Sequence, residues 1–257
     1  MTFSEQIWYG LFKPSKYKEL LELRARRSVA FVVVIMLVLG LVTFVVPVAA
    51  IITGFGGMNK LFTETMAPVS YDGEKLSIEK PFKLVADGNI FIINTDNATV
   101  ADEELKSDGI YMAFGSQNMR LVSVIGGEIW SDSALPLNQM LTAGFNNDSL
   151  VAMIPILYLS LFLGFLFNCL TFFIKYAIFA LILSIFINSM NRQFELGLSR
   201  GQVFMLCFYG QSMGMVVSNF NLAMRLVSPT FVSIITIFVS IHFITTAVML
   251  MQKGKQL

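Results

Sequence analysis

The sequence predicts a polytopic α-helical membrane protein, with four or five transmembrane helices and one small α/β extracytoplasmic domain inserted between helices 1 and 2. Three observations predict this class. Of 257 residues, 55% are hydrophobic and 14% charged, with a mean hydropathy of +0.69, whereas soluble domains are about 45–50% apolar and about 25% charged. Uncharged stretches of membrane-spanning length recur along the chain. A charged segment separates the first of them from the rest.

The first uncharged stretch covers residues 28–53. Its 26 residues contain no Asp, Glu, Lys or Arg, and about 20 apolar helical residues are enough to cross the hydrocarbon core of a bilayer. We therefore predict transmembrane helix 1 there. Charged residues recur through the preceding segment, residues 1–27, and no small-residue cleavage site follows a short apolar core. We expect a retained anchor and not a cleaved signal peptide.

The C-terminal part, residues 149–252, is predicted to form a bundle of transmembrane helices. Its uncharged segments, followed by a tail at 253–257, cover residues 149–174, 176–191, 201–224 and 226–252. If residues 149–191 turn back at Lys175, there are five crossings; length favours this, because one helix would reach roughly 64 Å. If they cross once, there are four crossings, and Arg192, Arg200 and the C-terminal lysines are all cytoplasmic; charge favours this. The sequence leaves both open.

Charges on the two sides of helix 1 predict its orientation. Six basic residues and three glutamates precede it, whereas residues 54–148 contain thirteen acidic and six basic residues. Basic residues concentrate on the cytoplasmic side of membrane helices. We therefore expect a cytoplasmic N-terminus and an extracytoplasmic domain at 54–148.

The N-terminal segment 1–27 also has an amphipathic pattern. Its apolar residues at helical spacing are Phe3, Ile7, Trp8, Leu11 and Phe12. An aromatic face followed by the basic stretch 16–27 is typical of a helix lying on an anionic inner leaflet. The simpler interpretation, which we prefer, is that the basic residues only determine topology.

The segment 54–148 reads as one small α/β domain. Its β-rich runs are Lys83–Val85, Ile90–Ile93, Ile110–Phe114 and Met119–Ile125. The pairs Asp72-Gly73 and Asp87-Gly88 are typical of hairpin turns. We expect one helix beginning near Thr99, with acidic residues in its first turn. We expect another short helix, capped by Asp132 or Ser133 and extending through Leu141.

His242 is the only histidine of the chain, so any histidine-based catalytic or proton-transfer site would have to use it. It lies within a predicted transmembrane segment, where polar residues are costly and are functional candidates by default. The structural alternative, a neutral imidazole bonded to a neighbouring helix, is the more common one. A proton-linked role is the other interpretation.

Small residues recur every four positions at Gly210, Gly214 and Ser218. This spacing lets two helix backbones approach closely within a membrane. Gln211 and Asn219 add polar groups to the same helix. We favour a packing role for these five residues over a substrate path, because Glu195 is the only acidic residue after Asp148 and lies in a predicted loop.

The sequence contains no motif for cofactor binding. Phosphate-binding loops, dinucleotide fingerprints and zinc-type cysteine spacings are all missing. The acidic stretch from Asp96 to Glu104 lacks EF-hand spacing, because Ala98 and Thr99 occupy ligand and glycine positions. Cys169 and Cys207 both lie in apolar runs. We therefore expect no catalytic residues, no metal, no cofactor and no nucleic-acid partner.

Several short features resemble a family of bacterial membrane proteins called domain of unknown function 1189. They are the aromatic stretch 3–12 before residues 16–20, the Asp87-Gly88 turn before residues 90–95, residues 103–105 before 108–111, and the apolar C-terminal half. Asn94 departs from the aspartate typical of the second feature. The resemblance implies a bacterial plasma-membrane location, and some members are labelled maltodextrose-utilisation proteins. Residues 198–204 and Tyr209-Gly210 are also distantly similar to the Yip family.

Three hypotheses about function follow. The first is a non-enzymatic accessory, scaffold or sensor protein whose outer domain binds a partner while its helices pack against a membrane-protein partner or a second copy. The second is a component of (malto)oligosaccharide transport or utilisation, as the family label implies. The third and least favoured is a membrane-embedded enzyme, which would need a nucleophile and a base facing one cavity.

Overall fold

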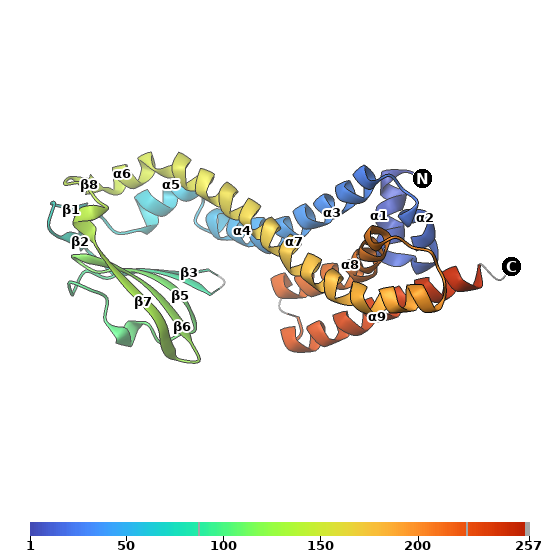
Figure 1. Ribbon diagram of the computed structural model, residues 1–257. Coiled ribbons are helices and arrows are strands. Elements are labelled where there is room, and N and C mark those ends of the chain that lie inside the picture. The colour runs from blue at the N-terminus through green and yellow to red at the C-terminus, as the bar shows by residue number, and fades with distance from the viewer. Residues whose placement is uncertain (87, 225, 255–257) are drawn as a thin grey trace. The chain divides into compact units, whose positions relative to one another are not determined.

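The computed structural model describes residues 1–86, 88–224 and 226–254 (Figure 1). Asp87 and Lys255, which entered the predictions above, lie outside these residues. The chain forms two compact units. The helical unit comprises Met1–Val46 and Leu163–Leu257, and the insert domain comprises Pro47–Phe162.

The N-terminal part of the helical unit is made of short helices followed by a long one. They are α1 (Phe3–Phe12), η1 (Pro14–Lys16), α2 (Tyr17–Leu21), α3 (Ala25–Gly40) and the π-helical segment η2 (Leu41–Val45). A capping box begins α1: the Thr2 hydroxyl accepts from the Glu5 amide, and the Glu5 carboxylate accepts from the Thr2 amide. These bonds to Thr2 lower the pKa of Glu5. The predicted N-terminal helix is therefore present.

The described residues contain four helices long and apolar enough to cross a membrane. They are Ala25–Gly54, Ile154–Gln193, Arg200–Asn221 and Thr230–Lys253. The first combines α3, η2 and α4 (Val46–Gly54), and its π-helical segment lies just before Pro47, which has no amide to donate. The others belong to α7 (Ile154–Gln193), α8 (Arg200–Met224) and α9 (Pro229–Lys253).

Helix α7 decides between the alternatives of four and five long helices. It continues for 40 residues without a break at Lys175, so residues 149–174 and 176–191 do not form a hairpin. No glycine or proline occurs near Lys175 to end the helix, and lysine is a good helix former. Its ammonium lies 5.4 Å from the Tyr176 ring centroid. The length of this segment had favoured five crossings. That argument was wrong, because part of the 40-residue helix α7 belongs to the insert domain.

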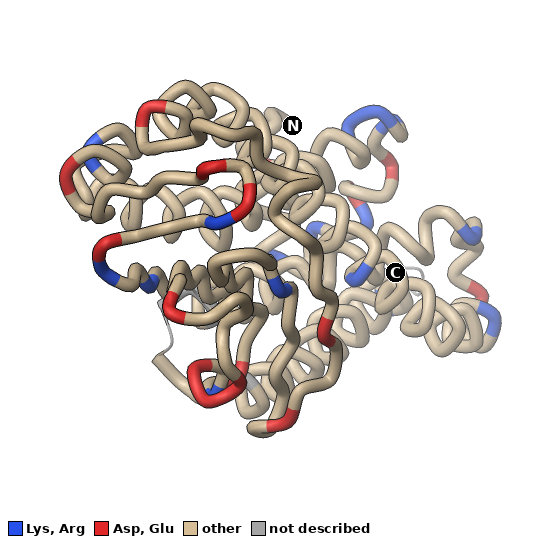
Figure 2. The backbone as a smooth tube through the Cα atoms, turned by 90° about the vertical axis from the view of Figure 1, so that its left-hand side faces the viewer, with Lys and Arg blue, Asp and Glu red and all other residues tan. Residues whose placement is uncertain are grey.

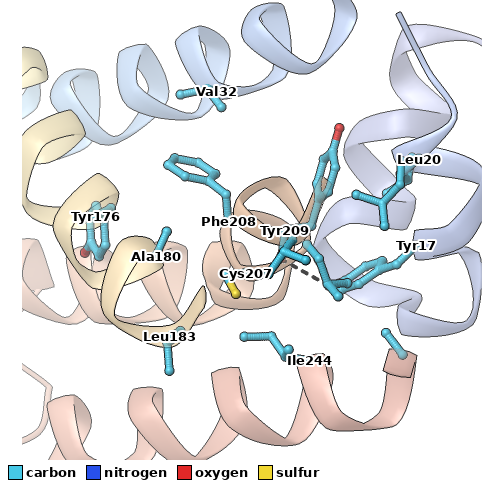
Figure 3. Packing of buried hydrophobic residues seen from close by; sticks show 14 of the residues in the cluster. Tyr17, Leu20, Val32, Tyr176, Ala180, Leu183, Cys207, Phe208, Tyr209 and Ile244 are labelled. Carbon is cyan, nitrogen blue, oxygen red and sulfur yellow. Dashed lines mark hydrogen bonds between the residues drawn. The ribbon is translucent and has the colours of Figure 1, made fainter. Parts of the chain in front are cut away.

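Helix α8 is the centre of the helical unit. In its most apolar window 61% of the residues are buried, against 22–33% for the other three candidate spans. Its fully buried side chains include Leu206, Cys207, Phe208, Tyr209 and Met215. Figure 3 shows α8 residues between side chains of α2, α3, α7 and α9. Because α8 is enclosed by protein, it can carry polar residues that a lipid-facing helix avoids.

The insert domain contains two β-sheets. Its strands are β1 (Val69–Tyr71), β2 (Leu76–Ile78), β3 (Phe82–Ala86), β4 (Asn89–Ile93), β5 (Gly109–Phe114), β6 (Asn118–Ile125), β7 (Glu128–Pro136) and β8 (Phe145–Asn146). The small sheet has the order β2-β1-β8 and the large sheet the order β3-β4-β5-β6-β7. All pairs are antiparallel except β4 and β5. The predicted small α/β region is therefore present.

Short helices complete the insert domain. They are α5 (Met58–Lys60), η3 (Leu61–Thr65), η4 (Asp102–Glu104), η5 (Leu137–Gln139) and α6 (Asn147–Ala152). The predicted turn at Asp72-Gly73 joins β1 to β2, and amides of Glu74 and Lys75 donate to the Asp72 carboxylate. These backbone hydrogen bonds lower the pKa of Asp72.

Two predicted helices of the insert domain were wrong. The helix expected from Asp132 through Leu141 is strand β7 as far as Pro136 and then the short 3₁₀ helix η5. The strand forms because Gly126 and Gly127 adopt φ of 64° and 79° and turn the chain back beside β6. The helix expected near Thr99 is only the 3₁₀ turn η4. Thr99 does not cap it.

Each face of the large sheet packs against different residues. On one face Ile90, Tyr111 and Val122 form a core with Val100 and Leu105 from the connection between β4 and β5. On the other face Ile93 and Met119 join the core formed with the small sheet and η3. Figure 2 shows acidic residues on many loops and turns of the insert domain. Many of the acidic groups of the domain thus lie on its loops and turns.

Candidate functional site

The insert domain contains an apolar cavity of about 450 Å³. Small-molecule sites typically have volumes of roughly 300–1,000 Å³. The residues that line the cavity are Val69, Leu76, Phe91, Ile93, Met112, Phe114, Met140, Leu141, Thr142, Phe145, Leu150, Met153 and Leu157. Among these described residues Thr142 alone is polar, and none is charged. The cavity is therefore suited to an apolar group.

The cavity walls come from four parts of the domain. Strands β4 and β5 supply one wall, in which the rings of Phe91 and Phe114 lie 5.4 Å apart. The small sheet and the connection before β8 supply two more. The last wall is formed by Leu150 of α6, Met153 and Leu157 in the first turn of α7. The wall helix α7 thus continues into the helical unit.

Two asparagines hold α6 in place. Asn146 caps the helix by accepting from the Ser149 amide at 3.0 Å. Asn147 bridges two other elements: its Oδ1 accepts from the Val69 amide at 2.7 Å, and its Nδ2 donates to the Phe62 carbonyl at 2.6 Å. These bonds attach the α6 wall to β1 and η3. The cavity is therefore framed by directed bonds as well as by apolar packing.

In the helical unit, the predicted small residues face a neighbouring helix. A Cβ at Gly210 would collide with the Ile244 side chain of α9, and one at Gly214 would lie 2.5 Å from Thr236 Cγ2. Ser218, one further step along α8, is half-buried. At these two positions, the absence of a side chain allows the backbones of α8 and α9 to approach closely.

The predicted polar residues of α8 instead contact α7. Asn219 donates to the Tyr176 hydroxyl at 2.6 Å, and Gln211 donates to the Tyr176 carbonyl at 2.9 Å. Both side chains are buried. Gln211 Oε1 has no hydrogen-bond partner among the described residues. These residues join two helices and are not among the residues that line the cavity of the insert domain.

Replacing Asn219 with alanine tests this link. The substitution removes the amide that reaches Tyr176 and leaves the phenol without that donor. We expect it to lower the free energy of unfolding by about 1 kcal/mol, the usual net contribution of one hydrogen bond. Thermal unfolding in detergent measures the loss. Phe220→Ala is the matched control, since Phe220 is the exposed neighbour on the same helix, and an equal loss there would contradict a specific role for Asn219.

His242 lies on the exposed surface of α9. Its ring contacts that of Phe243, with centroids 6.4 Å apart. Its backbone carbonyl accepts from the Thr245 hydroxyl at 3.1 Å. The structure therefore does not bring His242 together with Gln211 or Asn219.

Sequence reasoning missed a buried polar cluster that ties the N-terminal helices to α8. Gln6 is fully buried, and its amide donates to the Arg27 carbonyl and the Tyr209 hydroxyl, each at 3.2 Å. Tyr17 donates to the Gly10 carbonyl at 2.9 Å and the Tyr209 carbonyl at 3.1 Å (Figure 3). Burial raises the pKa of Tyr17. In the sequence, this cluster is marked by Gln6, a polar residue within a helix rich in aromatic residues.

One face of α1 is packed against the interior of the helical unit. Gly10 packs against the Phe31 ring, and a Cβ there would lie 2.8 Å from it. Ile7 and Leu11 are partly buried against the same core, whereas Phe3, Trp8 and Phe12 are exposed. Helix α1 is therefore part of the helical unit and also presents aromatic residues outward.

The chain was compared with known families, curated proteins and solved structures. A family model described as "Protein of unknown function (DUF1189)" matches residues 4–250. The chain belongs to this family. No curated protein and no solved structure matches it. The suspected family is thus confirmed.

The DUF1189 match includes α1, the insert domain and almost all of α9. The arrangement of an N-terminal helical segment, a first long helix, an inserted α/β domain and three further long helices therefore lies within the family model. The described residues contain no group of three or more His, Cys, Asp or Glu side chains placed to hold a metal ion. The cavity of the insert domain has room for a small ligand, and a second apolar cavity, of about 500 Å³, lies in the helical unit among residues of α3, α7 and α8.

Proposed function

We propose that this chain is a multi-pass protein of the bacterial plasma membrane that acts without catalysis, as an accessory or sensor protein. Its insert domain lies outside the membrane and binds a ligand or a partner. Its helical unit packs against a membrane-protein partner or a second copy of the chain.

The observation that carries this proposal is the apolar cavity of the insert domain. One of its walls is the first turn of α7, and the same helix contributes Phe172, Tyr176 and Ala180 to the core of the helical unit. A ligand that contacts Leu157 therefore contacts a helix shared by both units. This covalent continuity supports a role in sensing.

The alternative functions find less support in these contacts. An oligosaccharide loses its hydrogen bonds to water on binding and needs polar partners in exchange, and Thr142 is the one polar side chain among the described lining residues. A membrane-embedded enzyme needs a nucleophile and a base facing one cavity, and His242 lies on the outer surface of α9. The transport hypothesis stays a prediction.

Site-specific photocrosslinking in cells tests the accessory role. Benzoylphenylalanine replaces Ile110 or Leu121, which are exposed on the cavity side of the large sheet, or Val85, the exposed control on its other side. We expect a discrete adduct of higher mass at Ile110 or Leu121 and little at Val85. No adduct beyond the single chain at either test position would contradict the proposal.

Cysteine labelling tests the membrane arrangement. With a cytoplasmic N-terminus and four crossings, Arg192, Arg200 and Lys253 lie in the cytoplasm and the insert domain outside. An impermeant maleimide should therefore label Ser131→Cys in intact cells, and label Gln193→Cys only after the cells are opened. Both labelling variants also carry Cys169→Ala, which removes one of the two native cysteines. The other, Cys207, is buried and is left in place. Labelling of Gln193→Cys in intact cells would refute this orientation.

A further inference from the structure

We infer that the cavity of the insert domain binds the hydrocarbon chain of a membrane lipid. This inference rests on the proposed function and names the class of ligand for the same site. The polar end of the lipid stays at the surface of the domain, and its acyl chain fills the space between the large sheet and the wall formed by α6 and α7.

The chemistry of the lining selects a hydrocarbon. Twelve of the thirteen lining residues are apolar, so a polar ligand would give up its hydrogen bonds to water and regain few. Met112, Met140 and Met153 are among them. Methionine side chains are flexible and polarizable, and they adapt to irregular apolar ligands. A chain with many rotatable bonds fits such a lining better than a rigid polar molecule does.

The cavity adjoins a long apolar helix along the sequence. Its lining residues Met153 and Leu157 lie on either side of Ile154, where α7 begins, and α7 is one of the candidate membrane spans. Ile156 and Leu159, in the same turns, are 59% and 57% exposed. One side of this part of α7 thus lines the cavity, while neighbouring residues present exposed apolar surface on the same helix. A helix that continues from the cavity into a candidate membrane span favours lipid as the source of an apolar ligand.

The lining reaches the surface of the domain at the large sheet. Met112 lines the cavity and is 42% exposed. Its cross-strand partner Leu121 and its neighbour Ile110 on the same face are also exposed. Next to them on this face, Ser123 pairs with Ser131 across β6 and β7. An apolar track therefore leads from the cavity toward hydroxyl groups, as an acyl chain with a polar end requires.

Photolabelling of the full chain tests the inference. The protein is placed in vesicles of phosphatidylethanolamine and phosphatidylglycerol that contain a phosphatidylethanolamine with a diazirine in one acyl chain. After irradiation, mass spectrometry maps the adducts. We expect adducts on peptides covering β4 and β5, which belong to no candidate membrane span. A second set of vesicles contains free palmitic acid bearing a diazirine, which separates a phospholipid from a fatty acid as the source of the chain.

Cavity-filling variants provide the control. Met112→Trp and Met153→Trp each place a large side chain on the lining, and either is expected to reduce labelling of β4 and β5 severalfold. Ile125→Trp, on an exposed apolar position of β6 outside the lining, should leave labelling unchanged. Labelling of α7 and α9 in the same samples reports that each variant is inserted.

The outcomes separate this inference from the proposed function. Adducts on β4 and β5 that both filling variants reduce support a lipid site. No adducts there with either probe, or adducts that neither variant changes, overturn it. If the crosslinks from Ile110 or Leu121 then identify a protein partner, the accessory role stands without the lipid ligand. If those crosslinks fail as well, both proposals fall.

Discussion

Gly210→Leu is expected to produce a large loss of stability in the helical unit. The Ile244 side chain of α9 occupies the space where a Cβ at Gly210 would lie, and both residues belong to the buried interior of the unit. A leucine therefore forces α8 and α9 apart or pushes Ile244 out of the core. Overpacking of this kind costs about 1–3 kcal/mol, and more where backbone must move. Thermal unfolding of the full chain in detergent, followed by the loss of monodisperse protein, measures the effect.

Two further variants make the Gly210 result specific. Gly201→Leu, in the first turn of the same helix with no atom within 4 Å of a built Cβ, should unfold like the wild type. Ile244→Ala in the Gly210→Leu background removes the colliding group and should restore part of the stability, giving a coupling free energy between the two sites. Additive effects would show that the two side chains do not share this space.

Arg120→Met is expected to destabilise the insert domain. The Arg120 side chain is 10% exposed, and its guanidinium donates to Asp132 at 2.6 and 3.2 Å, to Asp102 at 2.7 Å and to the Val100 carbonyl at 2.7 Å. These carboxylates raise the pKa of Arg120, Asp132 most. Methionine matches the length and leaves the carbonyl and both carboxylates without their donor. The carboxylates remain partly hydrated, at 67% and 39% exposure, so we expect a loss of about 2 kcal/mol and not the full cost of breaking a buried pair.

Hydrogen exchange followed by mass spectrometry measures the Arg120 effect within the full chain. Amides of β6 should exchange roughly thirtyfold faster, the equivalent of about 2 kcal/mol. Arg120→Lys keeps the charge but loses the two-pronged contact with Asp132, so it should lie between wild type and Arg120→Met. Lys83→Met, an exposed position on β3, is the control for removing a basic residue from the sheet. Unchanged β6 exchange in Arg120→Met would show that this cluster does not hold the domain together.

Much of the fold could be predicted because its determinants are local. The long apolar helices follow from uncharged runs, and the small-residue spacing at Gly210 and Gly214 predicted a helix contact that the structure contains. The strands β3 to β6 follow from β-rich runs. The hairpin at Gly126-Gly127 was also readable, since two consecutive glycines match a two-residue turn. It was missed because the polar residues of β7 resembled a helix cap.

The candidate site could not be predicted, because its parts come together only in three dimensions. The cavity lining joins residues from Val69 to Leu157, and none of them carries a local signal of binding. The same holds for Gln6, which meets Tyr209 across 203 positions of sequence. His242 was singled out by its rarity, yet a rare residue on a helix says nothing about the direction in which it points.

The enclosed position of α8 has a consequence for how the protein is made. Its best window has a mean hydropathy of 1.2, against 2.2–3.2 for the other long helices, so α8 by itself is a weak substrate for the insertion machinery. The earlier helices α3 and α7 leave the ribosome first, and α9 follows α8 directly. If the helical unit is inserted in a membrane, as we propose, we expect α8 to depend on these neighbours to stay in the bilayer. Release of the chain before α9 would then leave α8 without the residues of α9 that pack against it.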